Sequence, residues 1–477
     1  MTSNFAFAAL QRAYSQPDAT AFSAERKVSY QRFADLTVNF ARRLEALGVG
    51  RDATVALAIQ DLPLAIAAVT AVGLLGARWV QLADIAPATF PGTTHVLTSG
   101  AGAERPGGIA IDPNWLDAGV STEAALTGFA GAATPDATWM IAHSSGTTGK
   151  LKYMPLSYEA VGRRIANPEL QDGAPPTTLT LFSPLSYIGA KIGTGNLVLG
   201  GTNAQWAPWE QLLAGGVNRI MGSPAQFTSA IFSRTAPPAR KIRSAKVTGA
   251  AVTQKFVETA LRYFDELYVL YGATEVGTTT LAVYTDAAQY NGSAGHPYEG
   301  AVVEILDADG RPCPAGTEGM VRVKTDWAVP GYIGEPELTA AYFQDGWFHP
   351  GDLGTLDSTG ALTITGRTGD VINAGGRKLN AAELDEIIQA HSEVQDGYCF
   401  IDRDQFGADV LAVVLALTPT ANPSCLAEIR DAAIAKLGKS KSPQRFYIAA
   451  KVPRNENGKP MRREAAAGVG GYVLIEV

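Results

Sequence analysis

The sequence predicts an α/β protein: a large N-terminal domain with two α/β subdomains and a distorted β-barrel, followed by a small α+β C-terminal domain. Three observations support this fold class. The 477 residues exceed the size of a single core. Helical patterns alternate with short β-branched runs through most of the chain, which favours largely parallel sheets. The alternation is interrupted after about Gly292 and resumes from Gly366.

The first elements are a helix over 33–47, a strand over 54–58 and an uncharged apolar helix over Leu62–Ala77. That apolar run is shorter than the ~20 residues that span a bilayer. Gly73 and Gly76 favour close packing, so we interpret the run as a buried helix. Further strands are expected at 177–182, 219–221, 246–248 and 267–270, with helices at 225–233 and 254–263.

Short strands at 301–305, 319–323 and 361–364, separated by turns such as Asp309-Gly310 and Asp345-Gly346, predict an antiparallel, barrel-like part. A helix over 381–389, a strand over 410–417 and a helix over 424–437 follow. We therefore place the N-terminal domain at 1–366 and the C-terminal domain at 367–477.

The composition of the chain argues against several classes of function. The net charge of −7 provides no basic footprint for nucleic acid or anionic membrane. The three cysteines are far apart, which does not indicate a zinc or redox site. The five histidines lack H-E-x-x-H spacing, which does not indicate a catalytic metal site. The N-terminus lacks the basic start and apolar stretch of a signal peptide. We expect a cytoplasmic protein that is not inserted into a membrane.

The strongest local signal is the run from Ser144 to Lys152, SSGTTGKLK. Small residues let the backbone bend around an anion, while backbone N–H, hydroxyl and ammonium groups donate to phosphate oxygens. The run is not a Walker A loop, because Ser144 stands where that motif needs glycine. A flexible turn is the alternative for this segment alone.

Four further segments follow in a fixed order: Tyr271–Glu275, Gly346–Asp352, Gly366–Asp370 with Gly375-Gly376 behind it, and Pro453–Arg462. Together with the Ser/Thr/Gly loop they resemble the motifs of the adenylate-forming superfamily, which includes acyl-CoA synthetases, nonribosomal-peptide adenylation domains and luciferases. The resemblance implies an AMP-forming acid–thiol ligase. Such an enzyme uses ATP and Mg²⁺ to form an acyl-AMP, which it then passes to a thiol.

The resemblance also implies roles for individual residues. Glu275 would ligate Mg²⁺, Thr274 would donate to the α-phosphate and Tyr271 would offer a flat face to adenine. Asp352 would accept hydrogen bonds from the ribose, which Arg367 would also reach. The full expected nucleotide-binding set is Ser144, Ser145, Gly146, Thr147, Thr148, Gly149, Lys152, Gly249, Ala250, Ala251, Tyr271, Gly272, Ala273, Asp352 and Arg367.

Lys459 is the expected catalytic residue of adenylation, together with Thr274 and Glu275. A lysine between the attacking carboxylate and the phosphate stabilises the charge that spreads over the transition state. Gly369 occupies the hinge position of the resemblance, where glycine supplies torsional freedom. The C-terminal domain would rotate there between the half-reactions.

Several positions depart from the family pattern: Leu151, Tyr153, His349-Pro350 and Asn373. Asn373 stands where some members carry a second lysine. None of the other departures removes a charged group, so we interpret them as variation within the family.

The segment Phe182–Gly189 resembles the acyl-pocket motif, with Tyr187 at the gating position. Ser183–Gly195 contains no Asp or Glu to pair with an α-ammonium, so a free amino acid is disfavoured. The expected pocket lining is mostly apolar, which suits an aryl or modest aliphatic acid. The expected pocket lining is Tyr187, Ile188, Gly222, Ser223, Thr248, Val276 and Thr278.

The chain ends soon after the lysine loop, so we expect an acceptor that acts in trans. Coenzyme A is the first candidate, the phosphopantetheine of a separate acyl carrier protein the second, and an amine the weakest. A luciferase-like oxygenase, a chemically silent nucleotide-binding protein and a P-loop ATPase are the alternatives from other classes.

Overall fold

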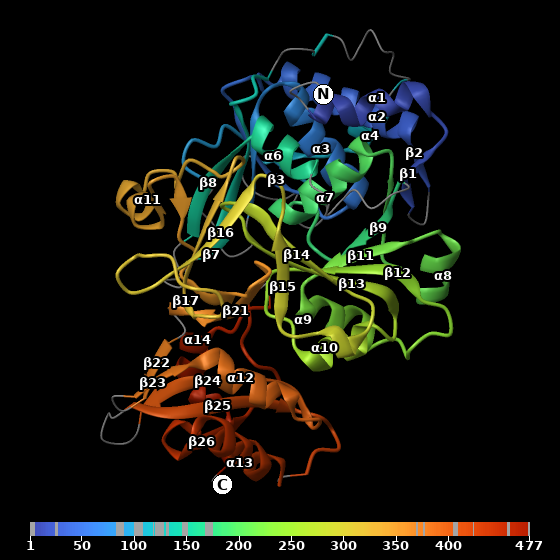
Figure 1. The fold of residues 1–477 in the computed structure, drawn as a ribbon. Coiled ribbons are helices and arrows are strands. Elements are labelled where there is room, and N and C mark those ends of the chain that lie inside the picture. Colours follow the sequence, from blue (N-terminus) through green and yellow to red (C-terminus); the bar gives the residue numbers. More distant parts are fainter. Residues whose placement is uncertain are drawn as a thin grey trace.

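The computed structural model describes residues 5–23, 27–82, 90–99, 108–117, 119, 128–129, 133–145, 151–166, 175–368, 371–374, 377–403, 409–422, 424–455 and 458–475. Three large bodies of secondary structure follow one another along the chain, and the C-terminal one lies beneath the other two in Figure 1. In the described residues, no helix combines the length and apolar character that a membrane crossing requires.

The first sheet has the strand order β6-β5-β3-β4-β7-β8, parallel except for the antiparallel pair β7–β8. Its strands are β3 (Thr54–Ala58), β4 (Arg78–Gln81), β5 (His95–Thr98), β6 (Ile109–Ala110), β7 (Thr138–Ser145) and β8 (Leu151–Ser157). Its helices are α1 (Phe5–Ser15), α2 (Tyr30–Ala46), α3 (Leu62–Leu74), α4 (Pro113–Leu116) and α6 (Tyr158–Ile165).

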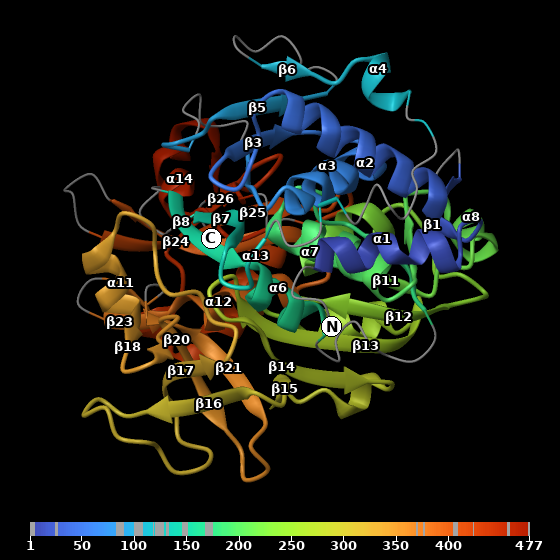
Figure 2. The same ribbon diagram turned by 90° about the horizontal axis from the view of Figure 1, so that it is seen from above.

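Helix α3 is buried along nearly its whole length, as its apolar sequence predicts, and Asp61 caps its N-terminus. It lies beside α1 and α2 in Figure 2, in the largest hydrophobic cluster of the described chain. The burial of α3 is therefore provided by protein packing.

The second sheet contains a parallel half in the order β10-β9-β11-β12-β13, with β1 and β2 beyond β10. Its strands are β1 (Thr20–Ser23), β2 (Val28–Ser29), β9 (Thr177–Thr180), β10 (Thr202–Ala204), β11 (Arg219–Gly222), β12 (Ile242–Val247) and β13 (Phe264–Ala273). Its helices are α7 (Tyr187–Val198), α8 (Trp209–Ala214), α9 (Pro224–Phe227), the π-helical turn η2 (Thr228–Phe232) and α10 (Gln254–Ala260).

Because these strands are parallel, their carboxyl ends meet at one edge, which is where ligands bind in such sheets. The residues that follow β9, β11, β12 and β13 therefore lie side by side. They include the segments predicted for acid and nucleotide binding.

The antiparallel part continues the same sheet through β14 and β15. The sequence pattern, which changes after about Gly292, does not reveal that the sheet is continuous. Its elements are β14 (Gly277–Tyr284), η3 (Ala287–Gln289), β15 (Ser293–Pro297), β16 (Ala301–Leu306), β17 (Gly319–Thr325), α11 (Pro336–Tyr342), β18 (Phe343–Gln344), β19 (Trp347–Phe348), β20 (Asp352–Leu356) and β21 (Leu362–Arg367). The predicted antiparallel pairing is confirmed by β16–β17 and β20–β21.

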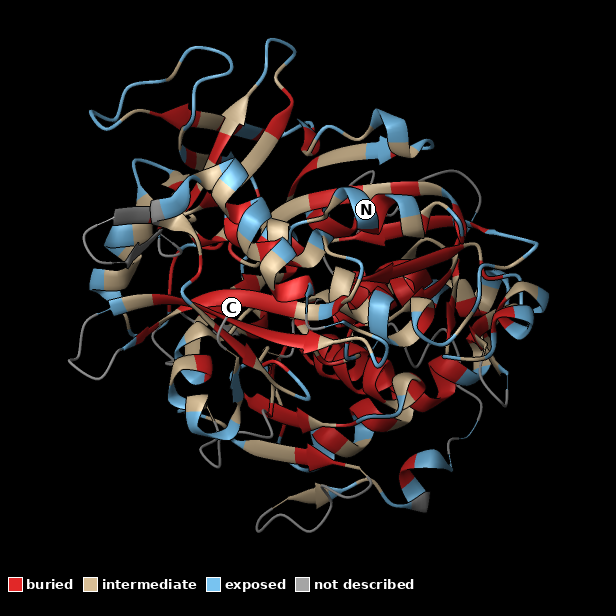
Figure 3. Ribbon diagram, turned by 90° about the horizontal axis from the view of Figure 1, so that it is seen from below, coloured by how far each residue is buried: buried red, intermediate tan, exposed pale blue. Residues whose placement is uncertain are grey.

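The C-terminal body is built on the four-stranded sheet β24-β25-β26-β27, with buried apolar clusters on both faces. Its elements are the hairpin β22 (Val371–Ala374) and β23 (Arg377–Asn380), then α12 (Ala381–Ala390), β24 (Val394–Arg403), β25 (Asp409–Leu417), α13 (Cys425–Leu437), η5 (Lys439–Lys441), β26 (Arg445–Ile448), α14 (Arg462–Ala467), η6 (Val469–Gly471) and β27 (Val473–Ile475). Figure 3 shows buried strands in the middle of the molecule and exposed loops around its rim.

Candidate active site

Tyr271, Asp352 and Arg367, three residues from distant motifs, meet in one group that is joined by a hydrogen bond and an ion pair. The phenol of Tyr271 donates to Asp352 Oδ2 at 2.6 Å, and Arg367 Nε lies 2.7 Å from Asp352 Oδ1. Asp352 and Arg367 face each other across β20 and β21. Burial, and then the Asp352 carboxylate, raise the pKa of Tyr271 well above its usual value, so the phenol remains a donor.

The turn that joins β13 to β14 presents Glu275. Its carboxylate is buried and accepts a hydrogen bond from Tyr332 Oη, which lies 2.8 Å from Glu275 Oε1. The backbone carbonyl of Glu275 accepts from the N–H of Val329 at 2.8 Å. Burial and the neighbouring Glu275 charge raise the pKa of Tyr332, so this phenol also remains protonated. A fixed carboxylate is thus held at the edge of the sheet.

Glu275 is a single carboxylate rather than part of a protein metal cage. The described residues contain no group of three His, Cys, Asp or Glu side chains able to hold an ion. One carboxylate fits a magnesium ion that takes its other ligands from phosphate oxygens and water.

Lys152 lies beside two rings of the antiparallel part. Its Nζ is 4.0 Å from the ring centroid of Tyr342 and 5.2 Å from that of Tyr332, within cation–π range. The backbones of Ser144 and Ser145 pair with Lys152 and Leu151 across β7 and β8. The predicted loop residues Gly146, Thr147, Thr148 and Gly149 lie outside the described residues.

Gly272 and Gly249, two members of the expected nucleotide-binding set, are glycine for different structural reasons. A Cβ at Gly272 would lie 2.1 Å from the carbonyl oxygen of Gly277, so the β13–β14 hairpin requires glycine there. Ala273 pairs with Gly277 in the same hairpin. Gly249 has a φ of +91° and open space around it. It is exposed after β12 together with Ala250 and Ala251, where a flat ligand face can approach.

The expected acyl-pocket residues separate into two groups. Tyr187 begins α7 and is 9% exposed, while Ile188 packs beside Phe182, Met221 and Leu270. Val276, in contrast, packs in the apolar cluster of the antiparallel part.

The remaining pocket residues follow the strand ends. Gly222 ends β11, where a Cβ would lie 2.9 Å from Leu181 Cδ1. Ser223 is fully buried and caps α9. The N–H of Thr248 donates to the carbonyl of Gly222 at 3.2 Å, and Thr278 pairs with Gly272.

Lys459 lies on an exposed loop that the C-terminal body holds at both ends. Its N–H donates to Asn455 Oδ1 at 2.9 Å, and Arg454 donates to the carbonyl of Gly458 at 2.7 Å. A Cβ at Gly458 would lie 2.7 Å from Ala225 Cβ and 3.9 Å from Ser223 Oγ. The residue before Lys459 therefore lies at the end of β11, where the acyl pocket is expected. The expected hinge Gly369 is outside the described residues.

Comparison with known families agrees with this geometry. The model of the family described as AMP-binding enzyme matches residues 10–90 and 93–333, more than half of the chain. The chain belongs to this family. The adenylate-forming resemblance seen in the sequence motifs is thereby confirmed.

Two relatives illustrate the family. This AMP-binding chain is 30% identical over 228 residues to the fatty acid–[acyl-carrier-protein] ligase ScoC of Streptomyces coeruleorubidus, a match that spans 47% of this chain and 44% of that protein. It is 27% identical over 360 residues to a 4-chlorobenzoate–CoA ligase of Arthrobacter sp, over 71% of this chain and 67% of that protein. The chain thus spans less than half of the first relative's length.

Solved structures share the fold. The o-succinylbenzoate CoA synthetase MenE of Bacillus subtilis, bound to its acyl-adenylate, superposes with a TM-score of 0.81 at 22% identity and covers 97% of both chains. The amide bond synthetase McbA of Marinactinospora thermotolerans also gives 0.81, at 20% identity, over 97% of this chain and 99% of that one. These similarities establish the α/β adenylate-forming fold predicted from the sequence.

Sequence reasoning missed Arg164 and Tyr332 of this AMP-binding chain. Arg164 lies in α6 with no exposed surface, and its Nη1 donates to Tyr187 Oη at 2.8 Å and to the Thr274 carbonyl at 2.9 Å. Neither residue stands within a motif used for the resemblance. Their roles follow from contacts between distant segments, which local pattern cannot reveal.

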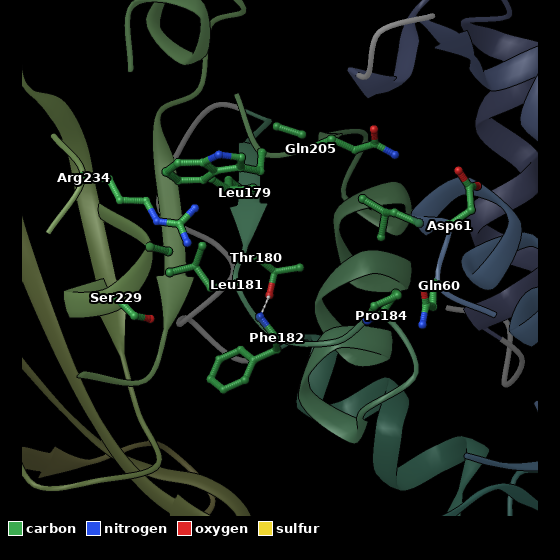
Figure 4. A pocket seen from close by; sticks show the side chains of 14 residues that line it. Gln60, Asp61, Leu179, Thr180, Leu181, Phe182, Pro184, Gln205, Ser229 and Arg234 are labelled. Carbon is green, nitrogen blue, oxygen red and sulfur yellow. Dashed lines mark hydrogen bonds between the residues drawn. The ribbon is translucent and has the colours of Figure 1, made fainter. Parts of the chain in front are cut away.

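A cavity of about 500 Å³ lies at the ends of β9 and β10, next to the segment where the acyl pocket is expected (Figure 4). Its wall includes Phe182 and Pro184, just before α7, and Arg234 on the opposite side. Leu181, which contacts Gly222, also lines it. None of the seven expected acyl-pocket residues lines this cavity, so it is an adjoining space that the sequence did not indicate.

Proposed function

We propose that this protein is an AMP-forming acid–thiol ligase that adenylates a carboxylic acid other than a free amino acid. The arrangement that carries the proposal is the meeting of three groups at one sheet edge. These are the Tyr271–Asp352–Arg367 group, the Glu275 turn and the Lys459 loop, whose Gly458 packs by Ala225 and Ser223.

The nucleotide would bind between the exposed Gly249–Ala251 segment and Tyr271. Glycine and alanine allow a flat base to approach, and the Tyr271 ring offers a π face. Asp352 keeps acceptor capacity after its contacts with Tyr271 and Arg367, because each carboxylate oxygen accepts more than one hydrogen bond. It can therefore receive ribose hydroxyls while its own position stays fixed.

Glu275 would hold Mg²⁺, since its carboxylate is fixed through one oxygen by Tyr332. When bound, the ion neutralises charge on the phosphates of ATP. Lys152, Thr274 and the Ser/Thr/Gly loop would supply donors to the same phosphates.

In the first half-reaction, an oxygen of the acid's carboxylate attacks the α-phosphorus of ATP and the bond to pyrophosphate breaks. Lys459 would place its ammonium between the two anionic groups and stabilise the charge of the transition state. In the second half-reaction a thiol attacks the acyl carbonyl. AMP leaves, and the thiol proton passes to solvent.

We propose the domain limits 1–366 and 367–477, with Gly369 as the hinge. The contact between Gly458 and Ala225 supports an arrangement suited to the first half-reaction, with the Lys459 loop turned toward the acyl site. Rotation at the hinge would then open the acyl-AMP to the thiol.

For the substrate we propose an aryl or modest aliphatic acid. The absence of Asp and Glu from Ser183–Gly195 supports this choice, as do the relatives named for a fatty acid and for 4-chlorobenzoate. Coenzyme A is the proposed acceptor, because several relatives are named as CoA ligases. The carrier-protein ligase among the relatives keeps phosphopantetheine as the alternative, ahead of an amine.

The test is a panel of aryl and aliphatic acids incubated with ATP and Mg²⁺, with CoA or with a holo acyl carrier protein. The proposal predicts AMP and a thioester for one class of acid, and the more productive acceptor identifies the ligase. ADP as the product, or oxygen uptake with light emission, would contradict it in favour of a P-loop ATPase or a luciferase-like oxygenase.

A further inference from the structure

Arg164 is a fully buried cation beside the candidate active site. Its four hydrogen bonds go to neutral oxygens: Nη1 donates to Tyr187 Oη at 2.8 Å and to the Thr274 carbonyl at 2.9 Å, and Nη2 donates to the carbonyls of Glu275 at 3.0 Å and Trp327 at 2.8 Å. No carboxylate in the described part of the chain forms an ion pair with it. Desolvating a guanidinium is costly, so neutral dipoles alone are an uncommon setting for one.

Two of these bonds fix the turn that carries Glu275. The carbonyls of Thr274 and Glu275 both accept from the guanidinium, and Trp327 Nε1 donates to the next carbonyl, that of Val276, at 2.7 Å. A Cβ at Gly277 would lie 3.1 Å from Arg164 Nε, so the turn closes directly over the side chain. The position of the Glu275 backbone therefore depends on Arg164.

The hydrogen bond to Tyr187 fixes the direction of the phenol proton. The phenol oxygen accepts from Arg164, so its own hydrogen must point away from the guanidinium. Tyr187 has no other hydrogen-bond partner among the contacts of the described residues. Its hydroxyl can therefore donate to a further acceptor on the side of the acyl site.

The surroundings of Tyr187 favour an anion as that acceptor. The Arg164 Cζ lies 5.4 Å from the ring centroid of Tyr187, and Nζ of the buried Lys191, one helical turn further along α7, lies 5.9 Å from it. The buried Arg164 guanidinium, which donates to the phenol oxygen, makes the local field at this phenol positive. A hydrogen bond from this phenol to a carboxylate would be charge-assisted.

We propose that Arg164 is a positioning residue that couples recognition of the acid to the Thr274–Glu275 turn, where the metal and the phosphates of ATP are proposed to bind. It orients the Tyr187 hydroxyl toward the carboxylate of the acid and holds the Thr274–Glu275 turn in place for MgATP. This inference rests on the proposed function and deepens it. Arg164, which lies outside every motif, would thereby set the position of the acid's carboxylate relative to the phosphates of ATP.

The experiment measures acid-dependent ATP–pyrophosphate exchange, with separate KM values for the acid and for MgATP. The variants are Arg164→Met, Arg164→Lys, Tyr187→Phe and the double variant Tyr187→Phe/Arg164→Met. The matched control is Arg163→Met on the same helix, since Arg163 is half-exposed and its ion pairs within the described residues are with the exposed Glu159 and Asp326. Thermal unfolding accompanies each variant to separate loss of structure from loss of positioning.

Tyr187→Phe is expected to raise the KM for the acid roughly tenfold and leave that for MgATP unchanged, because it removes one charge-assisted hydrogen bond. Arg164→Met is expected to raise both KM values. In the Tyr187→Phe background it should raise only that for MgATP, since the acid contact is already lost. Arg164→Lys should recover the effects partly, because an ammonium cannot reproduce the planar fork. Arg163→Met should match the wild type.

Three results would overturn the inference while the proposed function stands. Arg164→Met could leave both KM values at the wild-type level, its effect on the acid KM could persist undiminished in the double variant, or Arg164→Lys could behave as the wild type in both. The Lys variant also decides the matter if Arg164→Met does not fold. If the wild type itself catalyses no exchange with any acid, the proposed function fails and this inference falls with it.

Discussion

Gly458 packs against Ala225, so that the loop carrying Lys459 touches the start of α9: a Cβ on Gly458 would lie 2.7 Å from Ala225 Cβ. Ala225→Leu should therefore displace the lysine loop. We expect the rate of pyrophosphate exchange to fall about tenfold, because displacements near 1 Å cost a comparable or larger factor in positioned reactions.

The same variant separates the two half-reactions. Transfer from a supplied acyl-AMP to the thiol should be much less affected, since the Lys459 loop is proposed to leave the site before that step. Thr228→Val, an exposed change one turn further on, is the control. Equal losses in both half-reactions would contradict the proposed rotation.

Asp352→Asn should weaken nucleotide binding more than Tyr271→Phe does. The asparagine loses the ion pair with Arg367 as well as an ionised acceptor for the ribose, whereas the phenylalanine keeps both. We expect the Kd for ATP to rise roughly tenfold for Asp352→Asn, from the loss of charge-assisted bonds. Calorimetric titration without acid measures it, and an unchanged Kd would remove Asp352 from the nucleotide site.

Glu275→Gln should change the dependence on magnesium. The amide keeps the shape and an acceptor for Tyr332 but is a poor ligand for a hard cation. The Mg²⁺ concentration for half-maximal exchange should rise, with a lower maximal rate. Glu258→Gln, on the exposed side of α10, is the control. A magnesium curve that superposes on the wild type would rule out Glu275 as the ligand.

Gly272→Ala tests the packing of the β13–β14 hairpin, whose turn carries Thr274 and Glu275. The added methyl would clash with the Gly277 carbonyl oxygen, 2.1 Å away, so backbone must move. We expect a loss of roughly 2–4 kcal/mol in the free energy of unfolding. Gly50→Ala is the control, because a Cβ there meets nothing within 4 Å. Urea unfolding that gives equal stability for the two variants would show the hairpin to be less rigid than described.

His349 should make stability depend on pH. Partial burial, and then the Arg322 charge, lower the pKa of His349 below 6.5. The unfolded chain then binds more protons than the folded one between the two pKa values. Stability should rise with pH through the window just below 6.5 and level off above it. His349→Gln should flatten the slope in that window in denaturant titrations, and an unaltered slope would contradict this reading.

Much of the fold could be predicted because local pattern and burial agree. The strand Thr54–Ala58 was predicted with the limits that the structure gives, and it lies within a largely apolar run between Asp52 and Gln60. The expected regular helix over 225–233 is instead a short α-helix followed by a π-helical turn. There the Ser233 N–H and hydroxyl both bond to the Thr228 carbonyl, five residues back, which a hydrophobic period cannot indicate.

Sequence motifs predict a contact in the candidate site where two of them contribute to it. Tyr271 and Asp352 are named by their motifs, and the structure brings them into contact. The direction of Val276 was not predictable, because the bulge between Tyr271 and Gly272 shifts the register of the hairpin. Arg164 was not predictable either, since it acts through partners up to 163 positions away.

ATP–pyrophosphate exchange with a panel of carboxylic acids, measured for the wild type beside Lys459→Ala, tests whether Lys459 catalyses adenylation at this site. We expect exchange with one class of acid and a loss of about a hundredfold in Lys459→Ala, equivalent to ~3 kcal/mol of transition-state stabilisation. ATP should still bind to both proteins. If ATP binds and no acid supports exchange in the wild type, or if Lys459→Ala exchanges as fast as the wild type, adenylation at this site by Lys459 is contradicted.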